Sequence, residues 1–229
     1  MLSMRMMKYI VSALLLILVS LTCCGQNNTG ISNDSTRSEI KDVSTWGWIH
    51  TTYEYTDANG KRVIIQNSLP KGDRYIDATG QEYAKATFWT RIINETDNPL
   101  ELTIDFSGES YEFPGSVGAS GVRYYKLILH PDTLTRDKVD LYNYGLTDIK
   151  PFLDNRIDKP SSLKRTINPN ESSGFYVVRL GIVLKSDAQR VKADGSGVTR
   201  AGFSVKGQDV FWTLNGNAIQ CGKINLNLK

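Results

Sequence analysis

The sequence predicts an all-β fold, an antiparallel β-sandwich with one short helical insertion, in residues 45–229. Segments rich in aromatic and β-branched residues recur at intervals of roughly 8–15 residues, and polar turns separate them. Helical periodicity is scarce, and strands do not alternate with helices, which argues against a parallel α/β sheet. A stretch of about 185 residues suits one domain or a single elaborated sandwich.

The first two predicted strands form a hairpin. Residues 46–55 are dense in aromatic and β-branched side chains, and residues 62–66 resume that pattern after the turn Asp57-Ala58-Asn59-Gly60. A Gly-containing turn between two such runs is typical of a β-hairpin. The pattern returns at Asp77-Ala78-Thr79-Gly80, so we expect the same turn chemistry to be used twice.

The middle of the chain contributes four more predicted strands: residues 84–94, 100–106, 122–130 and 174–184. The second of these alternates strictly between apolar and polar residues, as a half-buried strand does. Residues 131–160 form a long insertion, with one short helix expected at 146–156 and interrupted at Pro151. We expect this insertion to pack as a lid on one sheet edge.

The C-terminal part is predicted to end in a hairpin. Strand-like residues 201–205, 209–214 and 218–228 close the domain, and Asn215-Gly216-Asn217 is a strong hairpin signal between the last two. Cys221 falls in the last strand, where we expect a small, buried apolar residue rather than a reactive thiol.

Two segments resemble a known class of domain. The first, Phe88 to Leu102, is an alternating strand that ends at Asn94 and is followed by a polar turn with Pro99. The second, Ile167-Asn168-Pro169-Asn170-Glu171-Ser172, precedes another strand. Both are similar to immunoglobulin-like domains of bacterial envelope lipoproteins of the Bacteroidetes type. The resemblance covers about a third of the chain and implies an immunoglobulin-like sandwich of uncharacterised function.

The N-terminus predicts export and lipid attachment. A start with Arg5 and Lys8 leads into an uncharged apolar run that is too short to span a bilayer, as in a secretory signal. The following Leu21-Thr22-Cys23-Cys24 resembles the lipobox of bacterial lipoproteins. Lipidation is expected at Cys24, with Cys23 as the alternative, because Leu21 stands three positions before Cys24. An ordinary signal peptide with incidental cysteines is the competing interpretation.

These features divide the chain into a signal peptide (residues 1–23), a flexible tether (24–44) and the β-sandwich domain (45–229). The tether is too polar to bury enough apolar surface to fold. We expect the protein to be membrane-anchored in the cell envelope, most simply at the outer membrane, on its periplasmic or surface leaflet. Without the two basic residues of the signal, 25 basic residues face 24 acidic ones, so no nucleic-acid partner is expected.

The sequence offers no catalytic motif, no metal site and no cofactor site. The only histidines, His50 and His130, have no second ligand at metal spacing, and we expect both to face solvent on strands. The glycine-rich residues 115–121 match neither a nucleophile elbow nor a phosphate loop and are expected to form a loop.

Aromatic residues are the one enriched feature with a functional interpretation. Trp46, Trp48, Tyr53 and Tyr55 cluster in the first strand and are possible ligand contacts. Core packing is the stronger expectation, because Trp46 and Trp48 would share one face of a strand. A protein-binding surface and a glycan platform are the alternatives. We therefore expect a non-enzymatic binding or structural module for another envelope protein, with carbohydrate capture as the second hypothesis and an undetected enzyme as the third.

Overall fold

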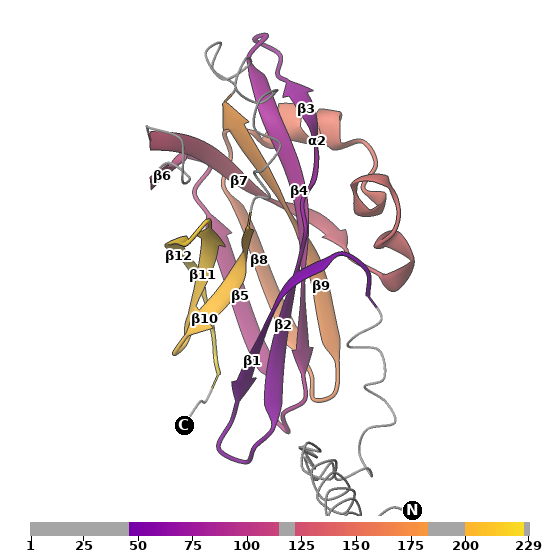
Figure 1. The fold of residues 1–229 in the computed structure, drawn as a ribbon, viewed down its shortest axis with the longest axis vertical. Coiled ribbons are helices and arrows are strands. Elements are labelled where there is room, and N and C mark those ends of the chain that lie inside the picture. Colours follow the sequence, from indigo (N-terminus) through magenta and orange to yellow (C-terminus); the bar gives the residue numbers. More distant parts are fainter. Residues whose placement is uncertain (1–45, 115–121, 183–199, 227–229) are drawn as a thin grey trace, which may run out of the picture. The chain divides into compact units, whose positions relative to one another are not determined.

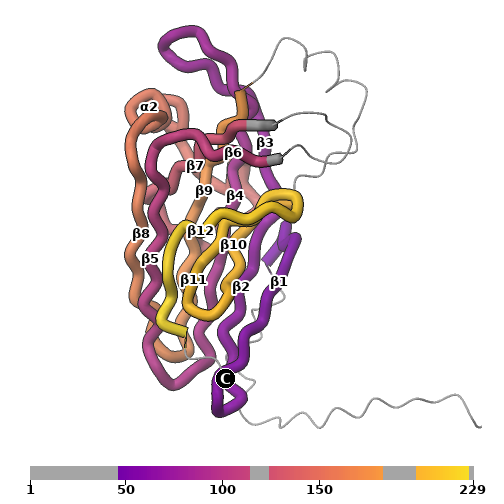
Figure 2. Tube along the Cα trace, turned by 90° about the vertical axis from the view of Figure 1, so that its left-hand side faces the viewer, coloured from indigo at the N-terminus to yellow at the C-terminus, as the bar shows by residue number. Residues whose placement is uncertain are grey.

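The computed structural model describes residues 46–114, 122–182 and 200–226. Within these residues two antiparallel sheets pack against each other, which confirms the predicted all-β sandwich (Figure 1). The seven-stranded sheet has the order β1-β2-β4-β9-β7-β6, and β3 pairs with the half of β4 that β2 does not reach. The five-stranded sheet, seen from its outer side in Figure 2, has the order β10-β11-β12-β5-β8.

The seven-stranded sheet contains β1 (Ile49–Thr56), β2 (Arg62–Ser68), β3 (Lys71–Ile76), β4 (Glu82–Asn94), β6 (Tyr111–Pro114), β7 (Val122–Thr133) and β9 (Ser172–Ile182). The five-stranded sheet contains β5 (Leu100–Phe106), β8 (Ser161–Ile167), β10 (Ala201–Lys206), β11 (Asp209–Leu214) and β12 (Asn217–Ile224). Between β7 and β8 the chain forms the 3-10 turns η1 (Arg136–Lys138) and η2 (Tyr142–Gly145) and the helix α2 (Ile149–Arg156).

The core between the sheets is built on aromatic rings. Phe203 lies edge-on to Trp212, with ring centroids 5.0 Å apart, and Trp212 lies edge-on to Phe88 at 5.5 Å. Edge-to-face pairs of this kind add to the stabilisation that burial alone provides. Cys221 is buried in the same core, as expected, and burial raises the pKa of its thiol to about 12.

The insertion covers the outer face of the seven-stranded sheet, the face turned away from the other sheet. Val139, Tyr144 and Leu153 pack there with Trp89 of β4 and Tyr176 of β9. The expectation of a lid on a sheet edge is therefore wrong. Central strands whose two faces are both apolar need a third layer to bury the second face. The expected interruption at Pro151 is also wrong: Pro151 lies in the first turn of α2, where a helix loses no hydrogen bond by lacking an N–H.

The repeated turn chemistry is confirmed. The Asp57 Oδ1 atom accepts hydrogen bonds from the backbone N–H groups of Asn59 and Lys61, both at 2.8 Å. Asp77 Oδ1 accepts the equivalent bonds from Thr79 and Gln81, at 2.8 and 2.9 Å. Each turn then needs its glycine, because Gly60 and Gly80 have φ of 79° and 86°.

The two segments that resemble envelope-lipoprotein domains lie against each other. The side-chain amide of Asn94 donates to the carbonyl of Ile167 at 2.9 Å, and the backbone N–H of Asn170 donates to the carbonyl of Asn94 at 2.8 Å. The N–H of Asn94 in turn donates to the Glu171 carbonyl at 2.9 Å. Asn94 is fully buried, so these bonds tie the end of β4 to the turn between β8 and β9.

Candidate functional site

The four aromatic residues singled out in the sequence do not form one group. Trp46 is buried against Trp89, with ring centroids 5.7 Å apart, under the guanidinium of Arg91 at 4.3 Å. Tyr53 and Tyr55 are half-buried and pack on the sandwich core, where the Tyr55 hydroxyl accepts a hydrogen bond from a backbone N–H of β10 at 2.7 Å. Core packing is therefore confirmed for these three residues.

Trp48 differs from the other three, and its side chain is 48% exposed. The expectation that it shares a strand face with Trp46 is wrong, because β1 begins only at Ile49 and Trp48 has a left-handed backbone with φ of 68°. Its carbonyl accepts a hydrogen bond from the N–H of Leu69 at 2.7 Å, which holds this conformation. Left-handed backbone is costly for a bulky residue and persists only where the surrounding contacts hold it.

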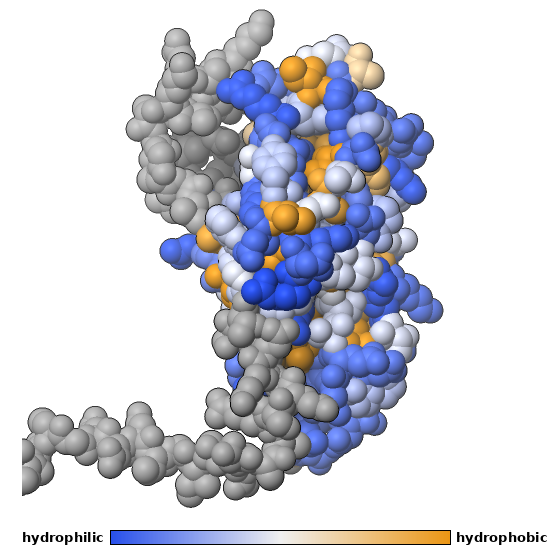
Figure 3. Space-filling model, turned by 90° about the vertical axis from the view of Figure 1, so that its right-hand side faces the viewer, coloured by the Kyte–Doolittle hydropathy of each residue, from blue (hydrophilic) through white to orange (hydrophobic). Residues whose placement is uncertain are grey.

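Two exposed residues of the insertion join Trp48 on one surface, and we call Trp48, Leu141 and Tyr142 the β3 face. Leu141 is 51% exposed and Tyr142 is 73% exposed. Lys71 of β3 connects them: its ammonium donates to the Leu141 carbonyl at 2.7 Å and lies 4.6 Å from the Trp48 ring centroid. Figure 3 shows this side of the molecule, where hydrophobic areas lie among hydrophilic ones.

The backbone next to the β3 face is held firmly. Asn143 and Tyr144 both have left-handed backbone, with φ of 47° and 58°. The Tyr144 ring is fully buried, its hydroxyl donates to the Leu69 carbonyl, and its own carbonyl accepts a hydrogen bond from Tyr176 at 3.0 Å. Lys71 also lies 4.1 Å over this ring. Leu141 and Tyr142 therefore stand on a rigid support, which lowers the entropy cost of binding through them.

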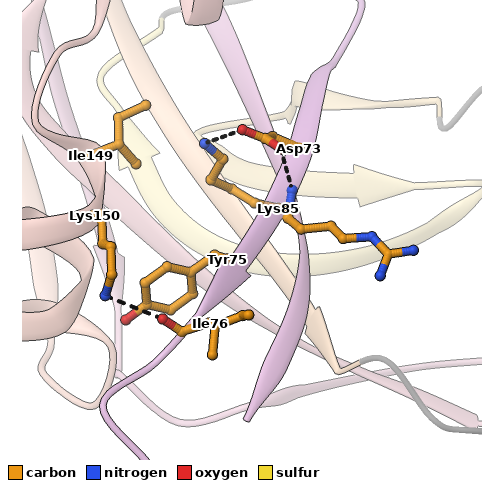
Figure 4. Close-up of a pocket in the computed structure, with 7 residues that line it drawn as sticks. Asp73, Tyr75, Ile76, Lys85, Ile149 and Lys150 are labelled. Atoms are coloured by element: carbon orange, nitrogen blue, oxygen red, sulfur yellow. Dashed lines mark hydrogen bonds and ion pairs between the residues drawn. The ribbon is translucent and has the colours of Figure 1, made fainter. Parts of the chain in front are cut away.

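A hollow of about 320 Å³ lies beside the β3 face, between the outer face of β3–β4 and the first turn of α2 (Figure 4). We call it the Lys85 hollow. It is lined by Asp73, Arg74, Tyr75, Ile76, Lys85, Ile149 and Lys150. Asp73 and Lys85 stand directly opposite each other on paired strands, and Figure 4 shows the Lys85 ammonium pointing toward the Asp73 carboxylate.

Hydrogen bonds and burial shift the pKa values of two charged groups in the hollow. Asp73 Oδ2 accepts a hydrogen bond from the Tyr142 hydroxyl at 2.8 Å, and Asp73 Oδ1 accepts one from the N–H of Arg74 at 2.7 Å. These bonds hold the pKa of Asp73 below its usual range. Burial lowers the pKa of the Lys85 ammonium, and the charge of Asp73 partly opposes that shift.

The histidines occupy other positions. His130 is buried, which contradicts the expectation of a solvent-facing residue, and its ring lies 4.3 Å from that of Phe152 on α2. His50 is half-buried on β1. Among the described residues no group of three or more His, Cys, Asp or Glu side chains is arranged to hold a metal ion. No helix in these ranges is long and apolar enough to cross a membrane.

The predicted lipidation residues, Cys24 and Cys23, lie outside the described residues, as do the signal peptide, the tether and the glycine-rich segment 115–121. The sequence signal for the Lys85 hollow was weak. Lys71-Gly72-Asp73-Arg74 looks like a charged connection, and nothing in it indicates a strand whose Asp73 faces a buried lysine. Comparison with known proteins adds no assignment, because no family model, no curated protein and no solved structure matches the chain.

Proposed function

We propose that this chain is a lipid-anchored cell-envelope protein, attached through Cys24 at the outer membrane, that acts as a non-enzymatic binding or structural module for another envelope protein. The lipobox-like Leu21-Thr22-Cys23-Cys24 and the apolar run before it support the anchor and the location. The polar residues 24–44 would act as a tether with an r.m.s. span of about 25 Å.

The observation that supports protein binding is the β3 face. Trp and Tyr are the residues that most often dominate the energy of protein contacts, and here they stand beside an exposed Leu on a rigid support. A partner with an apolar contact patch would bury Trp48, Leu141 and Tyr142 together. The Lys71 ammonium donates hydrogen bonds to the carbonyls of Val139 and Leu141 and also lies over the Trp48 ring. It therefore joins Trp48 to the part of the face that the insertion contributes.

A photo-cross-linking amino acid placed at Leu141 in the native envelope tests this function. The expected result is one discrete protein adduct, which disappears when Trp48→Ala is combined with the probe. The matched control carries the same probe at Asn59, an exposed turn residue, and should not form that adduct. The same adducts from both positions, or an adduct indifferent to Trp48→Ala, would rule out the β3 face as the contact.

Carbohydrate binding is the second candidate, and the Lys85 hollow favours it. The hollow combines a carboxylate and an ammonium, and the exposed Tyr142, which is not one of its lining residues, donates a hydrogen bond from its hydroxyl to Asp73 in the lining. A sugar ring presents hydroxyl donors and acceptors at its edge and C–H groups on its face. A site for it therefore needs hydrogen-bonding groups of both kinds beside an aromatic ring.

A further inference from the structure

Lys85 is a buried cation whose hydrogen-bonding capacity is unused within the described residues. Its side chain is only 7% exposed, and its nearest carboxylate oxygen, Asp73 Oδ2, is 3.8 Å away, beyond hydrogen-bond reach. No hydrogen bond or second ion pair joins the Lys85 ammonium to a described residue. An ammonium carries three donors, and Lys85 lines the hollow, so donors that no described residue accepts are open to it. A bound molecule with acceptor oxygens would therefore find three donors available in the hollow.

Acceptors and an aromatic surface lie beside this donor. Each Asp73 oxygen receives one hydrogen bond, from Arg74 N–H and from the Tyr142 hydroxyl, and a carboxylate oxygen can accept two. The ring of Tyr142 is the most exposed of the large apolar side chains of the described residues. The Lys85 ammonium and the exposed Tyr142 side chain thus both lie beside the Asp73 carboxylate, which can accept further hydrogen bonds.

The charges around the hollow are balanced. Lys150 is paired with Asp154, at 3.0 Å, and Arg74 is paired with Glu82. Lys85 faces Asp73, so each of the three cations has its own carboxylate. A site with no net charge favours a neutral ligand, because an anion would meet Asp73 and a cation would meet Lys85. A volume of about 320 Å³ is at the lower end for small-molecule sites, which fits a single ring.

We propose that the Lys85 hollow binds one ring of a neutral glycan. The Lys85 ammonium donates to a ring hydroxyl, the neighbouring hydroxyl donates to Asp73, and the Tyr142 ring packs against the C–H face of the sugar. Ile149 at the start of α2 contributes apolar contact. This proposal rests on the second candidate function and gives it a location and a ligand class. It shares Tyr142 with the protein contact proposed for the β3 face, but its donor and acceptor, Lys85 and Asp73, are not part of that face.

The test is a titration of the full chain, purified in detergent, with the methyl glycosides of glucose, galactose and mannose. Binding is followed by saturation-transfer NMR and the dissociation constant by ligand-shift titration. Lys85→Met keeps the length of the side chain and removes the donor. The matched control is Lys126→Met, because Lys126 is also largely buried but donates to the Gly108 carbonyl and pairs with Asp158, and does not line the hollow. Thermal melts establish that both variants fold.

At least one glycoside should bind saturably to the unaltered chain and roughly tenfold more weakly to Lys85→Met, with no change in Lys126→Met. Tyr142→Phe should bind nearly as well as the unaltered chain, and Tyr142→Ala should lose affinity, because the ring and not the hydroxyl contacts the sugar. No saturable binding of any glycoside, or equal binding by Lys85→Met, would overturn the proposal. So would inorganic phosphate binding in a Lys85-dependent manner without any glycoside doing so, since the hollow would then be an anion site. Retention of the Leu141 cross-link in Lys85→Met separates this outcome from that of the protein-binding function.

Discussion

Asn67 of β2 and Phe203 of β10 are joined by two hydrogen bonds across the sandwich. The Asn67 side-chain amide donates to the Phe203 carbonyl at 3.0 Å, and its carbonyl oxygen accepts from the Phe203 N–H at 2.9 Å. The side chain thus serves the backbone of β10 as a neighbouring strand would. Both residues are buried, so neither backbone group can exchange this bond for one with water.

Replacing Asn67 should destabilise the domain severely. Asn67→Ala leaves the buried N–H and C=O of Phe203 without acceptor and donor, at about 1–3 kcal/mol each. We expect the free energy of unfolding to fall by roughly 2–5 kcal/mol in urea titrations. The exposed turn residue Asn59, changed to Ala, is the control and should stay within about 0.5 kcal/mol. Similar midpoints for the two variants would contradict the two-bond connection.

Gly222 of β12 allows the two halves of the five-stranded sheet to meet. A Cβ atom there would stand 2.0 Å from the Thr103 carbonyl oxygen on β5, and backbone atoms cannot give way as a side chain can. Gly222→Ala should cost about 1–3 kcal/mol of stability. Gly72→Ala is the control, since its Cβ would meet only the Lys85 carbonyl at 3.4 Å. The comparison is made by chemical denaturation, and an Ala at position 222 tolerated as well as one at 72 would show that β12 and β5 can separate.

The C-terminal hairpin should be indispensable. Truncation after Gly207 removes Trp212, which is fully buried, together with Ile224 and Leu226. It also removes β11 and β12, which connect β10 to β5, and leaves β5 with an open edge. We expect the truncated protein to aggregate or to melt without cooperativity in circular dichroism. A sharp transition close to that of the full chain would mean that the two strands are an appendage.

Stability should depend on pH through His130. Burial lowers the pKa of His130 from the value of 6.5 that an exposed histidine has, so the folded state binds a proton less readily than the unfolded state. The contribution of His130 to the free energy of unfolding is constant above about pH 7. It decreases as the pH falls through 6.5 and levels off below the pKa of the folded state. The urea midpoint of the unaltered chain should therefore drop relative to His130→Phe between pH 7 and pH 5. A constant difference between the two proteins over that range would show that His130 titrates normally.

The lipid anchor can be tested directly in cells. Cys24→Ala should abolish labelling by a fatty-acid analogue and leave the precursor unprocessed, because the acceptor thiol is gone. Cys23→Ala should still be labelled. Labelling lost only in Cys23→Ala moves the anchor by one residue, and labelling that survives in both variants rejects the lipoprotein assignment.

Local turn chemistry explains which parts of the fold the sequence could predict. Asp57 and Asp77 bond their own following residues, and Asn215-Gly216 supplies the left-handed backbone that a hairpin needs, so each signal lies within a few residues. The strand β3 was missed because its Asp73 and Arg74 look like a polar connection, although they pair with β4. β8 was missed for a similar reason: Lys164 and Arg165 interrupt the apolar pattern of a strand at a sheet edge.

The candidate site was harder to predict, because it depends on contacts between distant segments. Trp48 has a left-handed backbone conformation just before β1. The hydrogen bond from the Leu69 N–H to the Trp48 carbonyl, which holds it, comes from a residue far along the chain. Lys85 lines a hollow only because α2 and β3 lie beside it. In the chain, Lys150 of α2 is 65 residues from Lys85, and Asp73 of β3 is 12 residues from it. Single-sequence patterns describe neighbours along the chain and carry no information on such a pair.

The burial of Trp46 has a mechanical consequence. Any pull applied to the chain from its N-terminal side reaches Trp46 before it reaches β1. The indole is seated between the edge of Trp89 and the guanidinium of Arg91, both on the central strand β4. Such a pull must therefore detach this indole from β4 before it can begin to separate β1 from β2.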